Sequence, residues 1–316
     1  RFEGQLRENQ QQIVQKFLTH INSSNATDGG GGGLLDLHTG FGKTVLALNI
    51  LAQIGVKTLI IVHKGFLVDQ WIERIEQFLP TAKVGRIQAK IIDIEDKDIV
   101  IGMLQSLSMK EYPDDLFQEF GLTILDEIHH LSAEVFCRAL QKICTMYTLG
   151  LSATMNRKDG LSKVFKMFIG DIIHKEKRKD ETTVIVKAIE FKVNDDEFNE
   201  MEYDYRGNAK YSTMISKLCS FNIRSELILN VIVNELKINQ KQQIMILAHN
   251  KCLLVYLYKA IEHRKITSVG YYIGGMKQAD LKISETKQII IATYSMASEG
   301  LDIKTLTTLI LATPKT

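Results

Sequence analysis

The chain has 316 residues, of which 45% are hydrophobic and 24% are charged, and its formal net charge is +2. This length suits two domains of about 150 residues each, and the composition is that of an ordinary globular protein. A nearly neutral charge excludes a polyanion-binding field over the whole surface, so any nucleic-acid site has to be a local patch. The longest apolar runs are far shorter than the ~20 residues of a membrane helix. We therefore expect no membrane association. The four cysteines have no metal-ligand spacing and are interpreted as reduced packing residues, so we expect a cytoplasmic location.

Apolar runs of strand length alternate with amphipathic, helix-period segments, which is the pattern of α/β domains with parallel sheets. The expected strands of the first half are 34–37, 58–62, 98–102, 122–125 and 148–152, and helices are expected at 67–78 and 133–144. The polar run HKEKRKDE (174–181) is the best linker candidate. We therefore place a first domain at residues 1–175 and a second at 176–316.

The second half continues the same alternation. It opens with TTVIVKAIEFKV (182–193), whose alternating apolar and polar residues predict a half-exposed strand. Residues 203–238 have helical periodicity, and a helix at 251–263 stands between later apolar runs. The sequence therefore predicts a second domain of the same architecture as the first.

A glycine-rich loop follows the first expected strand. In LLDLHTGFGKTVLALNILAQ (34–53) a strand, a loop and a helix follow one another, the order that forms a cradle for phosphate groups. Lys43 would neutralise the β- and γ-phosphates, and the hydroxyl of Thr44 would bind Mg²⁺. The earlier glycine run, 29–33, precedes the strand, so we interpret it as a flexible surface loop.

The loop is a variant of the general phosphate-binding pattern. Leu37 stands where that pattern has a glycine, so Gly40 and Gly42 are expected to form the tight turn. The expected nucleotide-binding residues of this loop are Leu37, His38, Thr39, Gly40, Phe41, Gly42, Lys43 and Thr44.

An acidic pair ends a later strand in LTILDEIHH (122–130). A Mg²⁺–ATP site needs acidic residues opposite its phosphate loop, so Asp126 would hold the metal and Glu127 would polarise the attacking water. A surface turn would also explain an isolated Asp-Glu pair. His129 and His130 invite a zinc interpretation, but no nearby cysteine or carboxylate completes a zinc site.

Together, TGFGKT (39–44), DEIH (126–129) and LSAT (151–154) resemble motifs I, II and III of superfamily 2 helicases of the DExH type. The segment LRENQ (6–10) is similar to the adenine-recognition segment of that superfamily, which implies that Gln10 reads the base with Arg7 beside it. The resemblance implies two RecA-like domains, ATP and Mg²⁺ as cofactors, and ATP hydrolysis coupled to movement on nucleic acid.

Further segments resemble motifs Ia, IV and V of the same superfamily: 59–71, 243–254 and IATYSMASEGLDI (291–303). The segment 99–107 is similar to the DNA-contacting stretch that follows motif Ia. The resemblance implies nucleic-acid contacts for Lys64, Gln105, Arg157 and Thr293. It implies nucleotide contacts from the second domain for Gly300 and Asp302. It also implies that His129, Ser152 and Thr154 couple nucleotide state to domain closure.

The segment LGLSATMNRKDG (149–160) resembles the XPB/UvsW group of DNA helicases, and YYIGGMK (271–277) is most similar to the transcript-release helicases of large DNA viruses such as poxviruses and asfarviruses. This implies DNA as the target and transcription machinery as a partner. Single-stranded DNA, duplex DNA, RNA and a DNA/RNA hybrid all stay open as substrates. A translocase that displaces bound complexes, an RNA helicase of the DExH type and a non-hydrolysing nucleotide-dependent scaffold are the alternatives.

Two departures from the family pattern stand out. Met155 occupies a position where many relatives have proline. Motif VI (QxxGRxxR), which supplies an arginine finger, would follow LILATPKT (309–316), where the sequence stops. We therefore expect a second domain that is incomplete at its C-terminus, and an excised fragment that hydrolyses ATP slowly on its own. Trp71 has apolar neighbours at helical spacing, which favours a core position over base stacking.

Overall fold

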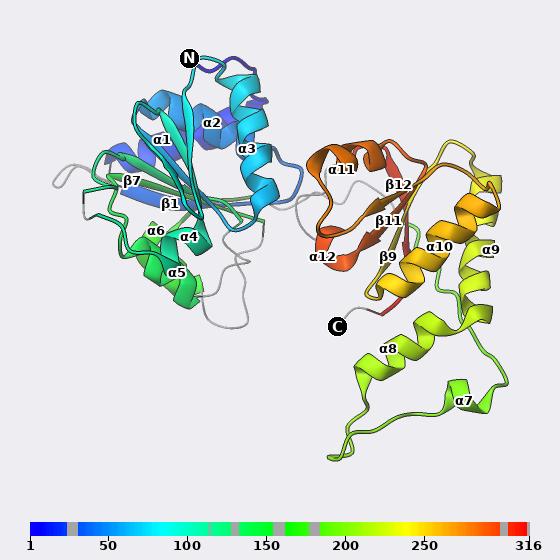
Figure 1. The fold of residues 1–316 in the computed structure, drawn as a ribbon. Coiled ribbons are helices and arrows are strands. Elements are labelled where there is room, and N and C mark those ends of the chain that lie inside the picture. Colours follow the sequence, from blue (N-terminus) through cyan, green and yellow to red (C-terminus); the bar gives the residue numbers. More distant parts are fainter. Residues whose placement is uncertain are drawn as a thin grey trace. The chain divides into compact units, whose positions relative to one another are not determined.

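The computed structural model describes residues 1–23, 31–113, 115–127, 133–153, 162–176, 184–297 and 303–314. The chain divides into two compact units, residues 1–183 (unit 1) and 184–316 (unit 2). Each unit has its own sheet (Figure 1). Among the described residues, no helix combines the length and apolar character that crossing a membrane requires.

Unit 1 is built on an eight-stranded sheet with the order β4-β3-β5-β2-β6-β7-β1-β8. Its strands are β1 (Gly31–Leu37), β2 (Thr58–Val62), β3 (Val84–Gln88), β4 (Ile91–Asp93), β5 (Ile99–Met103), β6 (Leu122–Leu125), β7 (Tyr147–Ser152) and β8 (Ile172–Glu176). All neighbouring strands run parallel except β3 and β4, which are antiparallel. The predicted fold class, α/β with parallel sheets, is confirmed.

Helices cover both faces of this sheet (Figure 1). The helices α1 (Glu8–Ser23), α2 (Lys43–Ile54) and α3 (Gly65–Phe78) pack on one face, and α4 (Leu104–Met109), α5 (Ala133–Leu140) and α6 (Ser162–Ile169) pack on the other. A parallel sheet covered on both faces needs strands that are apolar on both sides. This explains why β2 and β6 are buried at every residue.

The start of β1 corrects the interpretation of the glycine run. Residues 31–33 belong to the strand, so the prediction of a flexible surface loop was wrong for them. A Cβ on Gly32 would lie 2.3 Å from the carbonyl oxygen of Ile169, and one on Gly33 would lie 2.0 Å from Cδ1 of Ile173. Glycine is needed at position 32 because the backbone of β1 approaches another backbone segment too closely for any side chain, whereas at position 33 the obstacle is the end of the Ile173 side chain. Gly29 and Gly30 lie outside the described residues.

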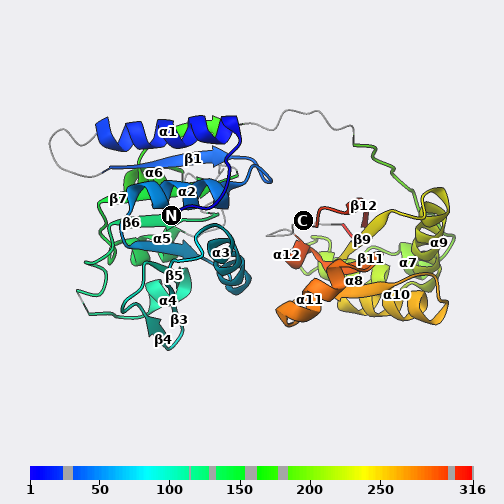
Figure 2. The ribbon, with the colours of Figure 1, turned by 90° about the horizontal axis from the view of Figure 1, so that it is seen from above.

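Unit 2 has a four-stranded parallel sheet with the order β10-β11-β9-β12. Its strands are β9 (Gln243–Ala248), β10 (Val269–Tyr272), β11 (Ile289–Thr293) and β12 (Leu306–Leu311). The helices α8 (Tyr211–Ser220), α9 (Asn222–Ile238) and α10 (Lys251–His263) share one core with the sheet, and α11 (Gln278–Glu285) and α12 (Tyr294–Ala297) share another (Figure 2). The short helix α7 (Asp196–Asn199) precedes α8.

Three expected elements differ from the structure. The described part of the expected strand at 182–193 has no regular structure, and Val184, Ile185 and Val186 are 77–85% exposed because no layer covers either side of them. Residues 203–210 are not helical and close a turn with a bridge between Tyr203 and Ala209. The polar run expected to be a linker contributes residues 174–176 to β8.

Candidate nucleotide-binding site

The phosphate loop and the acidic pair lie at the same edge of the unit 1 sheet. The loop follows β1 and the acidic pair follows β6, with β7 between the two strands. Since parallel strands all end at one edge, residues that follow neighbouring strands come together there. Lys43, the first residue of α2, reaches Glu127 with 2.7 Å between Nζ and Oε1. The structure therefore joins the two motifs into one site.

The loop before α2 turns at two glycines. Gly40 has φ +82° and Gly42, the residue before the helix, has φ +89°, both in the left-handed region. The N–H of Phe41 donates to the carbonyl of His38 at 3.2 Å and tightens the turn. The unpaired N–H groups of the first turn of α2 give this helix end a partial positive charge, which favours a phosphate group.

Gln10, expected to read adenine, and Arg7, expected to lie beside the base, both hold the phosphate loop in this structure. Nε2 of Gln10 donates to the carbonyl of Phe41 at 2.8 Å, and the Arg7 guanidinium donates to the same carbonyl. The Arg7 guanidinium also lies over the Phe41 ring, 5.4 Å from its centroid. Oε1 of Gln10 accepts the backbone N–H of Arg7 at 3.0 Å. The N-terminal segment thus fixes the position of the loop backbone, and base reading stays a prediction.

Gly40 and Gly42 form a matched pair for a mutational test. A non-glycine residue in the left-handed region costs about 1–2 kcal/mol. At position 40 an added Cβ meets no atom within 4 Å, whereas at position 42 it would lie 2.6 Å from Nε2 of Gln10. Gly40→Ala should therefore lower the free energy of unfolding by about 1 kcal/mol. Gly42→Ala should lower it further and also weaken ATP binding, because it displaces Gln10. Urea unfolding and ATP titration of both variants measure this, and equal effects would contradict it.

Asp126 is buried and held by two hydrogen bonds. The residue directly follows β6 and is 7% exposed. The indole Nε1 of Trp71 donates to Oδ2 at 2.9 Å, and the backbone N–H of Glu127 donates to Oδ1 at 2.9 Å. Burial, and then the neighbouring charge of Glu127, raise the pKa of Asp126 to about 6, against the opposing effects of Lys43 and the two hydrogen bonds. The positive charge of Lys43 thus only partly stabilises the ionised form of Asp126, and a bound cation would stabilise it further.

The donor set fits Mg²⁺. This ion prefers oxygen ligands and keeps several of its waters, so one or two protein oxygens are enough. Asp126 offers a carboxylate, and Thr44, in the first turn of α2, offers a hydroxyl. Neither here nor in the rest of the described part of the chain do three or more histidine, cysteine, aspartate or glutamate residues form a group that could hold a metal ion by themselves.

Glu127 has a left-handed backbone with φ +49°, an uncommon conformation for a residue with a side chain. Such conformations persist at functional sites where the surrounding structure enforces them. The side chains of Lys43 and Glu127 are 10% and 25% exposed, so their ion pair is only partly in contact with solvent. In this arrangement the cation and the candidate base neutralise each other.

The other predicted site residues are distributed as follows. Lys64 lies at the start of α3. Nε2 of Gln105 donates to the carbonyl of His63, the residue before Lys64, at 2.8 Å. Ser152 is fully buried at the end of β7. Thr293, at the end of β11, is 9% exposed, with its hydroxyl 3.2 Å from that of Ser295. His129, Thr154, Arg157, Gly300 and Asp302 lie outside the described residues.

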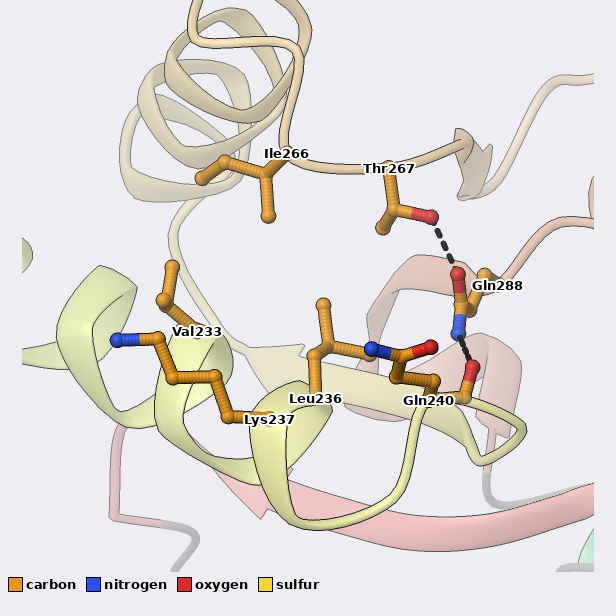
Figure 3. Close-up of a pocket in the computed structure, with 7 residues that line it drawn as sticks. All are labelled: Val233, Leu236, Lys237, Gln240, Ile266, Thr267 and Gln288. Atoms are coloured by element: carbon orange, nitrogen blue, oxygen red, sulfur yellow. Dashed lines mark hydrogen bonds between the residues drawn. The ribbon is translucent and has the colours of Figure 1, made fainter.

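A hollow in unit 2 shares no residue with this site. It has a volume of about 410 Å³ and lies between the end of α9 and the segments before β10 and β11 (Figure 3). The hydroxyl of Thr267 donates to Oε1 of Gln288, and Nε2 of Gln288 donates to the carbonyl of Gln240. The side chains of Thr267 and Gln288 are thus bonded within the wall of the hollow, which Lys237 and Gln240 also line.

A strand, a glycine-rich loop with Lys43 and a helix, together with an acidic pair after a nearby parallel strand, define a P-loop nucleotide-binding protein. Residues 3–157 match the family model of the res subunit of type III restriction enzymes.

Several viral proteins are similar to this chain. It is 39% identical over 319 residues to the candidate ATP-dependent RNA helicase L396 of Acanthamoeba polyphaga mimivirus, which covers 100% of this chain and 60% of the relative. It is 25% identical over 331 residues to the candidate helicase 161L of Invertebrate iridescent virus 6, covering 99% of this chain and 71% of the relative. It is 28% identical over 310 residues to QP509L of African swine fever virus, a candidate ATP-dependent RNA helicase, covering 89% of this chain and 59% of the relative.

Among solved structures, the UvsW helicase of bacteriophage T4 is 19% identical with a TM-score of 0.45 and covers 54% of this chain and 62% of that one. Taken with the motifs, the family model and the viral relatives support a superfamily 2 helicase of the viral type. The chain spans 60% of the length of the mimivirus relative.

Proposed function

We propose that the chain is the ATP-hydrolysing core of a helicase or translocase that moves on nucleic acid, with DNA as the principal target. One observation carries this proposal: the ion pair between Lys43 and Glu127 stands beside the buried carboxylate of Asp126, at the N-terminus of α2. To hydrolyse ATP, a protein has to neutralise the phosphate charge, bind the metal ion and orient the attacking water. This one edge offers a group for each of these tasks.

The residues divide the work as follows. Lys43 leaves Glu127 and binds the phosphates when ATP enters, because the nucleotide carries more negative charge than one carboxylate. That exchange frees Glu127 to orient and deprotonate the attacking water. Thr44 and Asp126 would hold Mg²⁺, which when bound stabilises the negative charge on the phosphate oxygens. Arg7 and Gln10 keep the loop in place through the carbonyl of Phe41.

Nucleic acid would contact Lys64, Gln105, Arg157 and Thr293, and His129, Ser152 and Thr154 would relay nucleotide state to domain movement. The resemblance of residues 149–160 to the XPB/UvsW group supports DNA as the target. Gly300 and Asp302 would complete the nucleotide contacts. A non-hydrolysing scaffold is disfavoured because Lys43, Asp126 and Glu127 are all in place.

An RNA helicase is the second candidate, because the relatives from mimivirus and African swine fever virus are named as ATP-dependent RNA helicases. A comparison of ATPase stimulation by single-stranded DNA, duplex DNA, RNA and DNA/RNA hybrid in the full-length protein separates the two. Stronger stimulation by RNA than by any DNA would overturn the choice of DNA. A strand-displacement assay run beside a protein-displacement assay then distinguishes unwinding from translocation.

Binding to nucleic acid should weaken steeply with salt and vary little with base sequence. The near-neutral net charge confines the interaction to a local set of phosphate contacts, which release counterions when they form. Fluorescence anisotropy of labelled oligonucleotides of several sequences, between low and physiological salt, measures the slope. An affinity independent of salt, or a strong preference for one sequence, would contradict a backbone-tracking site.

A further inference from the structure

Trp71 is the only tryptophan of the chain, and its indole bonds to the candidate metal ligand. The side chain lies on α3, is 1% exposed and belongs to the core between the helices and the sheet. A buried indole N–H needs an acceptor, and here the acceptor is Oδ2 of Asp126 at 2.9 Å. The expectation of a core position for Trp71 is confirmed, but it did not include this bond.

The two hydrogen bonds to Asp126 have different origins. The bond from the backbone N–H of Glu127 to Oδ1 comes from the adjacent residue. The bond from Trp71 to Oδ2 comes from a separate helix, so it fixes the carboxylate relative to α3. Each carboxylate oxygen can accept more than one partner, so both bonds leave capacity for a metal or its waters. With donors on both oxygens, the plane of the carboxylate is set before any ligand arrives.

We propose that Trp71 is a positioning residue that holds the Asp126 carboxylate in the orientation needed to receive Mg²⁺ with ATP. The inference rests on the proposed function, because it assigns Asp126 to the metal. Ring packing alone would be satisfied by phenylalanine, whereas orientation of the carboxylate requires the N–H. Outer groups that bond to metal ligands typically change metal affinity or activity by about 10–100-fold when removed.

A spectroscopic test uses the single tryptophan. Labelling the indole nitrogen with ¹⁵N gives one side-chain N–H resonance, because the chain has no other tryptophan. We expect this N–H to be protected from solvent exchange and its chemical shift to change on addition of Mg²⁺–ATP. In Lys43→Ala, at the same concentrations of Mg²⁺–ATP, we expect no change in chemical shift. In Asp126→Ala the resonance should shift and lose protection. A resonance unchanged by Asp126→Ala would overturn the proposal.

A binding test separates orientation from packing. The affinity of a fluorescent ATP analogue is measured by anisotropy with Mg²⁺ and with EDTA, in the wild-type protein, Trp71→Phe and Ile75→Ala. Ile75 lies on the same helix, is fully buried and shares the same core, so its truncation damages packing alone. The Mg²⁺-dependent gain is the ratio of the ATP affinity with Mg²⁺ to the affinity with EDTA. We expect this ratio to be about tenfold smaller in Trp71→Phe than in the wild type, because the variant lacks one hydrogen bond to a charged group. Its metal-free affinity should stay unchanged, and Ile75→Ala should keep the full gain.

If Trp71→Phe does not fold, the tryptophan is replaced by an analogue of the same shape in which sulfur takes the place of the ring N–H. Because the chain has one tryptophan, this replacement changes position 71 only. A full Mg²⁺-dependent gain in Trp71→Phe or in the analogue overturns the role of Trp71 and leaves the proposed function standing. A wild-type protein that binds no ATP overturns the proposed function, and this inference with it.

Discussion

Lys43→Ala should weaken the binding of Mg²⁺–ATP by about 30-fold or more. Removing one partner of a buried, hydrogen-bonded charge pair costs roughly 2–5 kcal/mol in binding, and each 1.4 kcal/mol is about tenfold in affinity. Lys43 is 10% exposed, so water replaces its charge poorly. Titration with a fluorescent ATP analogue measures the loss.

The matched control is Lys83→Ala. Lys83 is in the same unit, pairs with Asp96 and has a side chain that is 58% exposed, so its removal should leave ATP affinity unchanged. Circular dichroism and thermal unfolding establish that both variants fold. If Lys43→Ala bound ATP as tightly as Lys83→Ala, the phosphate groups would not lie at the start of α2.

Glu127→Gln should keep ATP binding and lower the rate of hydrolysis by about 10²–10⁴-fold, the usual contribution of a general base. The amide cannot take the proton of the attacking water. It also cannot form the ion pair that Glu127 makes with Lys43 at 2.7 Å, so ATP affinity should be equal to or higher than that of the wild type. Steady-state phosphate release and ATP titration on the full-length protein measure the two quantities.

Glu134→Gln is the control for this change. Glu134 is 75% exposed on α5 and pairs with Arg138, so its neutralisation should leave turnover unchanged. Wild-type turnover in Glu127→Gln would show that another group activates the water. A loss of ATP affinity in Glu127→Gln would show that the carboxylate is part of the binding site in its resting form.

The sequence predicted best those elements that are buried on every side. The strands at 58–62 and 122–125 were predicted to the residue because each is mostly apolar and is buried at every position. The start of β1 was missed because a glycine run reads as a loop, and only the neighbouring strand and helix reveal why no side chain fits there. The segment 184–193 shows the opposite error, since its alternating pattern predicts a strand and the structure leaves it unpaired.

In the candidate site, Lys43 and Glu127 were predicted from local motifs, and the sheet topology explains why they meet. The contacts made by Arg7, Gln10 and Trp71 were not predicted, because each joins segments far apart in the chain. For Trp71 the sequence does carry one signal, because a buried tryptophan needs an acceptor for its N–H. The resemblance supplied a base-reading role for Gln10, and its bond to the Phe41 carbonyl is a second role that no motif records.

The most direct test of the central claim is phosphate release by the full-length protein, measured with increasing single-stranded DNA in the wild type and in Glu127→Gln. We expect DNA to stimulate hydrolysis in the wild type, and we expect hydrolysis in Glu127→Gln to stay at background at every DNA concentration. Hydrolysis that ignores nucleic acid, or that persists undiminished in Glu127→Gln, would contradict the claim.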